Sequence, residues 1–290
     1  MNVPGQLVVK RYALFILLLF FAFLVVMPFV LMVTGSLKTV TEINASRFSL
    51  FPKSPQFSNY IKAFQHRPWG RWFLNSAIVA LTTTFVSLLV NSMAGYAFAR
   101  LDFNGRKLLF YTVLLALMVP RQLTILPRFI ILRSFPLAGG NNILGQGGTG
   151  FVNSYMGLML PIFAGAFGIF LCRQFYLNFP RSLDDAAEID GCNVVTTFFR
   201  IYIPNSQALL MSLGILKCTF AWNDYMWPLT IVQSERMMTV QLGLALFKDE
   251  TVTWETLLAA TTVVMLPLIV IFFLAQNRVV SGLVTSGMKE

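Results

Sequence analysis

Residues 12–36 read YALFILLLFFAFLVVMPFVLMVTGS, a run that contains no charged side chain. A helix needs about 20 consecutive apolar residues to cross the hydrocarbon core of a bilayer, and this run meets that requirement. It is too long for the apolar core of a signal peptide, and no small-residue cleavage site follows it. The backbone must satisfy its own hydrogen bonds in lipid, so we predict a membrane-spanning helix over 12–36.

Similar runs recur along the chain, separated by polar stretches rich in Pro, Gly and charged residues. None of them alternates polar and apolar residues as a barrel strand would. We therefore predict an all-α integral membrane protein with about six spans, forming a single transmembrane domain over residues 1–290. The five further spans are predicted at 72–99, 108–126, 152–171, 208–232 and 257–275.

The composition agrees with a membrane protein and excludes several other classes. Hydrophobic residues make up 56% of the 290 residues and charged residues only 12%, whereas a soluble domain typically carries about 25% charged residues. The net charge of +10 is spread through the loops between the apolar runs, so it does not indicate binding to nucleic acid. Three distant cysteines and a single histidine suggest neither a disulfide framework nor a metal site.

Residues 180–204, PRSLDDAAEIDGCNVVTTFFRIYIP, lie between the fourth and fifth predicted spans. The pattern predicts a short helix, a glycine turn and a second short helix. Gly191 suits the left-handed position after a helix end, Asn193 can cap the next helix, and that helix is expected to stop before Pro204. These features alone are equally compatible with an ordinary polar loop that contains two helical turns.

The same stretch closely resembles the EAA loop of ATP-binding-cassette importer permeases, whose pattern is EAA, three residues, Gly, nine residues, then I-x-L-P. Asp185 replaces the Glu and Ile203 replaces the Leu, which keeps the charge sign and the apolar character. Asp190 and the run WNDYMWPL at 222–229 resemble the carbohydrate-uptake branch, and the chain is similar overall to the smaller permease subunit of the maltose importer. The matching residues are Asp185, Ala186, Ala187, Gly191, Ile201, Ile203 and Pro204.

This resemblance implies that the loop at 172–204 is a cytoplasmic coupling helix-turn-helix that seats in a cleft of an ATPase subunit. Lys and Arg divide almost evenly between the two sides of the membrane, so the charge distribution does not set the orientation. The resemblance alone implies that the chain lies in a bacterial inner membrane with both termini in the cytoplasm. The residues expected to contact the ATPase are Asp184, Asp185, Ala186, Ala187, Asp190 and Gly191.

No phosphate-binding GxxxxGK[ST] motif occurs, so the chain is not expected to be an enzyme, to contain catalytic residues or to bind a cofactor itself. The resemblance instead implies that ATP and Mg²⁺ bind to two partner ATPase subunits. It further implies a second homologous permease subunit and an extracytoplasmic binding protein that delivers a sugar or oligosaccharide.

Five polar residues in or near the spans are candidates for the substrate path: Asn91, Lys217, Asn223, Asp224 and Tyr225. A charge such as that of Lys217 costs roughly 2.5–3.5 kcal/mol at a helix centre and usually faces the interior of a bundle. Lys217 could instead pair with Asp224 on the same helix face, and Asn91 could simply bond a neighbouring helix. Aromatic residues near the end of a span are often interfacial anchors rather than sugar-stacking platforms.

The loops on the outer side are basic, since Glu42 is the only acid in 38–72 and Arg121, Arg128 and Arg133 follow without one. A basic entrance concentrates anions, which favours an acidic oligosaccharide, although contact with lipid headgroups or with a binding protein explains these charges equally well. The alternative function is a secondary transporter or channel for a polar solute. Such a protein would use intramembrane carboxylates or inverted repeats, and no clear repeat is present.

Overall fold

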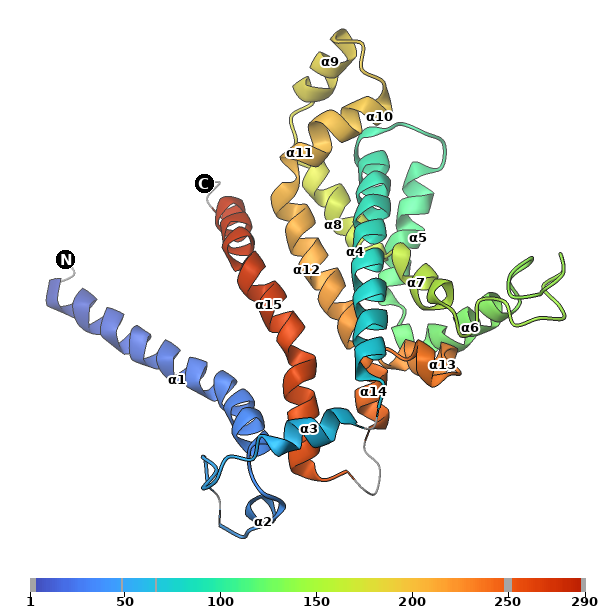
Figure 1. Ribbon diagram of the computed structural model, residues 1–290. Coiled ribbons are helices and arrows are strands. Elements are labelled where there is room, and N and C mark those ends of the chain that lie inside the picture. Colours follow the sequence, from blue (N-terminus) through green and yellow to red (C-terminus); the bar gives the residue numbers. More distant parts are fainter. Residues whose placement is uncertain (1–3, 48, 66, 248–251, 288–290) are drawn as a thin grey trace. The chain divides into compact units, whose positions relative to one another are not determined.

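The computed structural model describes residues 4–47, 49–65, 67–247 and 252–287, which form helices joined by turns and loops and contain no β-strand (Figure 1). The chain divides into two compact units, one made of residues 1–68 and 246–266 and the other of residues 69–245 and 267–290. The first unit contains α1 (Pro4–Ser36), α2 (Val40–Ile43) and α3 (Ser58–Gln65). Helix α15 (Trp254–Gly287) is divided between the two units.

The second unit contains most of the helices, several of which are short and separated by sharp breaks. These helices are α4 (Trp69–Arg100), α5 (Arg106–Met118), η1 (Arg121–Thr124), α6 (Ile125–Arg133), α7 (Tyr155–Phe163), α8 (Ala166–Leu177), α9 (Ser182–Ile189), α10 (Val194–Thr197), η2 (Phe198–Tyr202), α11 (Ile203–Asn205), α12 (Gln207–Asn223), α13 (Met226–Ile231), η3 (Glu235–Met237) and α14 (Val240–Leu246).

The apolar helices confirm an all-helical protein of the multi-span membrane class. By length and composition, four helices of the described chain can cross a membrane, and a bent pair raises the number to five. The predicted count of six remains a prediction, because α12 has only 17 residues and falls below the length required of such a helix. The four helices are Lys10–Ser36, Trp69–Arg100, Tyr155–Leu177 and Trp254–Leu274, and the bent pair is Arg106–Met118 with Arg121–Arg133.

Three predicted spans contain breaks or boundaries that the apolar pattern did not reveal. The span predicted at 108–126 stops at Met118 and bends by 107°, because Pro120 cannot continue the α-helix. The span predicted at 152–171 starts at Tyr155, breaks at residues 164–165 and continues to Leu177, so the loop predicted at 172–204 begins only after Leu177.

The span predicted at 208–232 ends at Asn223, where Asp224 adopts an extended backbone conformation before α13 begins. The spans predicted at 12–36, 72–99 and 257–275 are each part of a longer helix. Hydropathy detects only the apolar part of such helices, because their polar ends extend beyond it.

The first unit contains a loop that is held by local hydrogen bonds. Glu42 accepts hydrogen bonds from the backbone N–H groups of Thr39 (3.0 Å) and Lys53 (2.8 Å), and these bonds lower the pKa of its carboxyl group. Asn59 donates to the carbonyl groups of Ser36 and Lys38, both at 2.9 Å, which ties α3 to the end of α1.

Helix α4 is the centre of the second unit, where it packs against α7, α8 and α12. Two apolar clusters lie along it. One cluster includes Val79, Leu158 and Trp227, and the other includes Tyr96 and Tyr202. At the second cluster the α4 and α8 backbones approach closely, since a Cβ atom added at Gly95 would lie 2.8 Å from the backbone N of Arg173.

We predict that Gly95→Val destabilises the protein by about 2 kcal/mol or more, because the added atoms overfill the contact between α4 and α8. Gly70→Val, in the same helix, is the matched control, since a Cβ at Gly70 meets no described atom within 4 Å. Melting temperatures of the two variants in detergent measure the difference. Equal melting temperatures would show that the close approach at Gly95 does not matter.

Candidate functional site

The segment from Ser182 to Asn205 forms the helix, glycine turn and second helix that the sequence predicts. Gly191 has φ of 71°, a left-handed conformation that glycine adopts without steric cost. Its N–H bonds to the carbonyl of Glu188 (3.0 Å), and the N–H of Cys192 bonds to the carbonyl of Ala187 (2.8 Å). This pair of bonds is a Schellman motif, which ends α9 abruptly and reverses the chain.

The second helix begins as predicted, since Asn193 Oδ1 accepts a hydrogen bond from the N–H of Thr196 (2.8 Å). The expectation that it stops before Pro204 is wrong, because α11 (Ile203–Asn205) contains that proline. A π-helical turn, η2, precedes it, and the N–H of Ile203 bonds five residues back to the carbonyl of Phe198. The wider turn changes the α-helical spacing that would otherwise bring the proline ring against the preceding turn.

An ion pair fastens α9 to the end of α4. Arg100 Nη1 lies 3.2 Å from Asp184 Oδ2, and Tyr202 Oη donates a hydrogen bond of 2.7 Å to Asp184 Oδ1. Arg100 Nη2 also donates to the backbone carbonyls of Tyr176 (2.8 Å) and Phe179, where α8 ends. We call Arg100, Asp184 and Tyr202 the Arg100 anchor. It joins α4, α8, α9 and the π-helical turn.

Aromatic side chains surround the anchor. The Tyr202 ring stacks on Phe179 with centroids 5.3 Å apart, lies 4.6 Å from the Tyr96 ring, and has the Arg100 guanidinium 5.6 Å from its centroid. Burial, followed by the hydrogen bond to Asp184, raises the pKa of Tyr202 above its usual value. The hydroxyl therefore stays protonated at neutral pH and remains a donor to the carboxylate.

The six residues predicted to contact an ATPase divide into two groups. The Asp184 carboxylate is bonded within the chain, and Ala187 is 2% exposed, so both belong to the attachment of α9 to the rest of the unit. The other four are exposed at the end of the unit where α9 lies (Figure 1). These four are Asp185, Ala186, Asp190 and Gly191.

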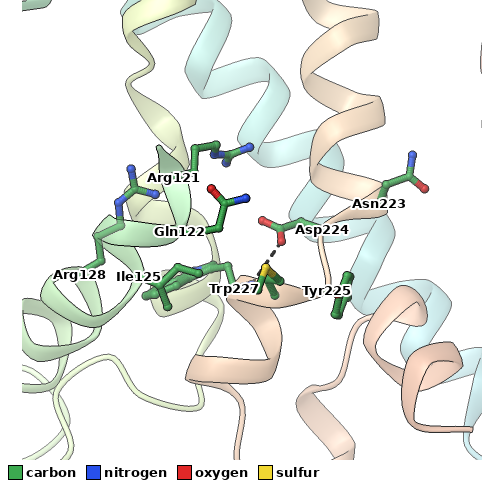
Figure 2. A pocket seen from close by; sticks show the side chains of 9 residues that line it. Arg121, Gln122, Ile125, Arg128, Asn223, Asp224, Tyr225 and Trp227 are labelled. Atoms are coloured by element: carbon green, nitrogen blue, oxygen red, sulfur yellow. Dashed lines mark hydrogen bonds between the residues drawn. The ribbon is translucent and has the colours of Figure 1, made fainter. Parts of the chain in front are cut away.

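A pocket of about 190 Å³ lies in the part of the second unit where two predicted spans break. One side is contributed by η1 and α6 after the bend at Pro120, and the other by residues 223–227, between α12 and α13. Figure 2 shows Arg121, Gln122 and Arg128 on one side and Asn223 and Asp224 on the other. Ile125, Tyr225, Met226 and Trp227 complete the lining.

The five residues predicted for the substrate path are not brought together. Asn223, Asp224 and Tyr225 line the pocket, whereas Asn91 and Lys217 lie at the break between α7 and α8. Asp224 Oδ1 accepts a hydrogen bond of 3.2 Å from the N–H of Trp227 and so caps α13. Trp222 and Trp227 are buried rather than interfacial.

Asn91 closes the break in the fourth span. Its Oδ1 accepts from the N–H of Gly165 (2.9 Å), and its Nδ2 donates to Ser87 Oγ (2.7 Å). Asn91 therefore bonds a neighbouring helix, which was one of its two expected roles. Lys217 Nζ lies beside the same glycine, 2.5 Å from the position of a Cβ added there. Lys217 and Asp224 thus have separate surroundings rather than forming a pair.

Sequence reasoning missed the main partners of both sites. Arg100 directly follows the span predicted at 72–99, and no local pattern links it to Asp184 or Tyr202. Arg121 and Arg128 were interpreted as part of a basic entrance, whereas both line the pocket. The signal that could have located them is Pro120, which breaks the helix directly before these residues.

Comparisons with known proteins support the interpretation of the chain as a permease. The family model described as "Binding-protein-dependent transport system inner membrane component" matches residues 91–284. The arabinooligosaccharides transport system permease protein AraQ of Bacillus subtilis (strain 168) is 32% identical over 288 residues, covering 98% of each chain. The lactose transport system permease protein LacG of Rhizobium radiobacter is 31% identical over 266 residues, 91% of this chain and 92% of that protein.

A solved structure has the same fold. It is a crystal structure of a bacterial ABC transporter involved in the import of the acidic polysaccharide alginate. The matched chain gives a TM-score of 0.78 over 96% of this chain and 98% of that chain. The identity is 18%, so this likeness speaks for the fold alone.

We predict that Asp184→Asn lowers the stability of the protein by about 2 kcal/mol or more, because it leaves the nearly buried Arg100 without its counter-charge. Asp102→Asn is the matched control. Its ion pair with Arg106 (2.7 Å) involves an aspartate that is 89% exposed, so its loss should cost about 0.5 kcal/mol or less. Thermal unfolding in detergent and proteolysis within 180–205 measure both effects. Equal responses would contradict a special role for the Arg100 anchor.

Proposed function

Since the chain belongs to the family of binding-protein-dependent transport system inner membrane components, as a permease of the sugar-importing ATP-binding-cassette type, we propose that it forms half of a sugar translocation pathway. In this proposal a binding protein delivers a sugar or oligosaccharide, and ATPase subunits drive its passage. The chain is a transport component and not an enzyme. The family membership also sets aside the alternative of a secondary transporter or channel.

The proposal that an ATPase acts on this chain rests on α9, which is exposed on one side and bonded through the Arg100 anchor to the rest of the unit on the other. Asp185, Ala186 and Asp190 face outward, while the Arg100 anchor fixes the helix to the ends of α4 and α8. An ATPase that pushes on such a helix would move the attached spans with it. We therefore assign the ATPase contact to the exposed residues and the transmission of force to Asp184 and Ala187.

The remaining parts of the assembly follow from this assignment. We propose a single transmembrane domain of six spans, with α12 as the short fifth span and both termini on the cytoplasmic side together with α9. The proposed partners are a second homologous permease, two ATPase subunits that bind ATP and Mg²⁺, and an extracytoplasmic binding protein. The chain itself is proposed to bind no cofactor.

The substrate class rests on the relatives. AraQ is described as an arabinooligosaccharides permease and LacG as a lactose permease, which supports an oligosaccharide as the transported solute. The basic outer loops favour an acidic member of this class as a finer proposal.

Isolation of the complex from native membranes tests the proposed function. We expect a second permease and an ATPase to copurify with the chain, and ATP-dependent uptake of a sugar when the complex and its binding protein are reconstituted in vesicles. Uptake of a sugar without the ATPase would contradict the proposal, as would copurification of the chain alone from gently solubilised membranes.

The two adjacent alanines of α9 give a paired prediction. Ala186→Trp should leave the melting temperature of the permease unchanged and reduce ATP-driven uptake at least about tenfold, because the bulk blocks the exposed face. Ala187→Trp should lower the melting temperature itself, because this side chain is 2% exposed. Melting temperature and uptake are measured for both variants. Normal uptake in Ala186→Trp would remove α9 from the proposed ATPase contact.

A further inference from the structure

The pocket at the two helix breaks contains two arginine side chains, Arg121 and Arg128. Among the described residues, neither the Arg121 nor the Arg128 guanidinium makes a hydrogen bond or an ion pair. The acid in the same lining, Asp224, caps α13 through the N–H of Trp227. Arginine in or near a span normally pairs with a counter-charge, because an uncompensated charge there is costly. The two guanidiniums are therefore available to a ligand.

The charge of the lining indicates the kind of ligand. Arg121 and Arg128 contribute two positive charges and Asp224 one negative charge, so the pocket has an excess of one positive charge. A single carboxylate would neutralise it.

The uncharged part of the lining suits a sugar ring. Gln122 lies toward Asp224, Asn223 contributes a second, exposed amide that turns away from Gln122, and Tyr225 contributes a half-exposed aromatic ring (Figure 2). A guanidinium is planar and can hold a carboxylate through two parallel N–H bonds, which gives both affinity and orientation. Arginine next to amides and an aromatic ring therefore matches a sugar that carries a carboxylate better than a neutral sugar.

We propose that Arg121 and Arg128 bind the carboxylate of a uronic acid residue, so that this pocket selects acidic oligosaccharides over neutral ones as they pass through the permease. The proposal rests on the proposed function, since it assigns the substrate class of the same transport pathway. It differs from the basic-entrance interpretation, which attributes any preference for anions to all outer cations alike. Arg133, in the last turn of α6, separates the two ideas because it is exposed and does not line the pocket.

The test uses the reconstituted complex with its binding protein and pairs of oligosaccharides that differ only in a carboxylate, such as digalacturonate with galactobiose and diglucuronate with maltose. For at least one pair, we expect the wild type to transport the acidic member with the higher kcat/KM. Arg121→Gln and Arg128→Gln should each lower that value at least about tenfold, the loss expected for one charged hydrogen-bonding partner. Transport of the neutral member should change less than about twofold, and Arg133→Gln should behave as the wild type.

Several results would overturn the assignment. A wild-type preference for the neutral member of every pair would do so. An equal loss for both members, or dissociation of the permease complex in the arginine variants, would assign the two arginines to folding or to an acid on the partner permease. An equal loss of acidic-sugar transport in Arg133→Gln would attribute the preference to the summed charge of the outer loops and not to the pocket. Failure of every sugar in the wild-type complex would count instead against the proposed function.

Discussion

Free backbone groups at helix breaks are the constraint on which this structure depends. A lipid environment offers no water to satisfy an unpaired N–H or C=O, so each break within a span needs a partner from elsewhere in the chain. Helix α4 supplies such a partner at one break within a span and satisfies free carbonyl groups at two places beyond the predicted spans. Asn75 donates to the carbonyls of Arg236 (2.9 Å) and Met238 (2.8 Å), Asn91 accepts from the N–H of Gly165, and Arg100 donates to carbonyls at the end of α8.

This role explains why α4 contains buried polar side chains although it is long and apolar enough to cross a membrane. A polar residue in a span is commonly interpreted as part of a substrate path, and Asn91 was one such candidate. Its oxygen and its nitrogen are both bonded within the chain, so its contribution is to hold the interrupted fourth span together. In the proposal of a uronate site, the residues that bind the ligand lie at breaks that α4 does not close, in the pocket beside Asp224.

The sequence predicts those features that are encoded by neighbouring residues. The apolar runs located the helices, and Gly191 and Asn193 located the turn after α9, because a left-handed glycine and a helix cap each involve only a few adjacent residues. The Arg100 anchor could not be predicted, since Arg100 and Asp184 are far apart in the chain and each is polar in a way that also suits a solvated loop. The resemblance to the EAA loop instead assigned Asp184 to an outside partner. The end of α12 at Asn223 was missed because the apolar pattern continues across Asp224 into α13.

Helix α12 connects the segment proposed to receive the push of the ATPase with the pocket proposed to bind the sugar. It begins at Gln207, directly after the segment held by the Arg100 anchor, and ends at Asn223 in the lining of the pocket. Its 17 residues span about 25 Å, at about 1.5 Å per residue, so α12 links the two regions directly. The π-helical turn just before it has a hydrogen-bonding pattern that is rare in helices and often found at functional sites. Under the proposed function, a push on α9 would reach Asp224 through a single helix, and the width of the pocket would change with the position of the loop.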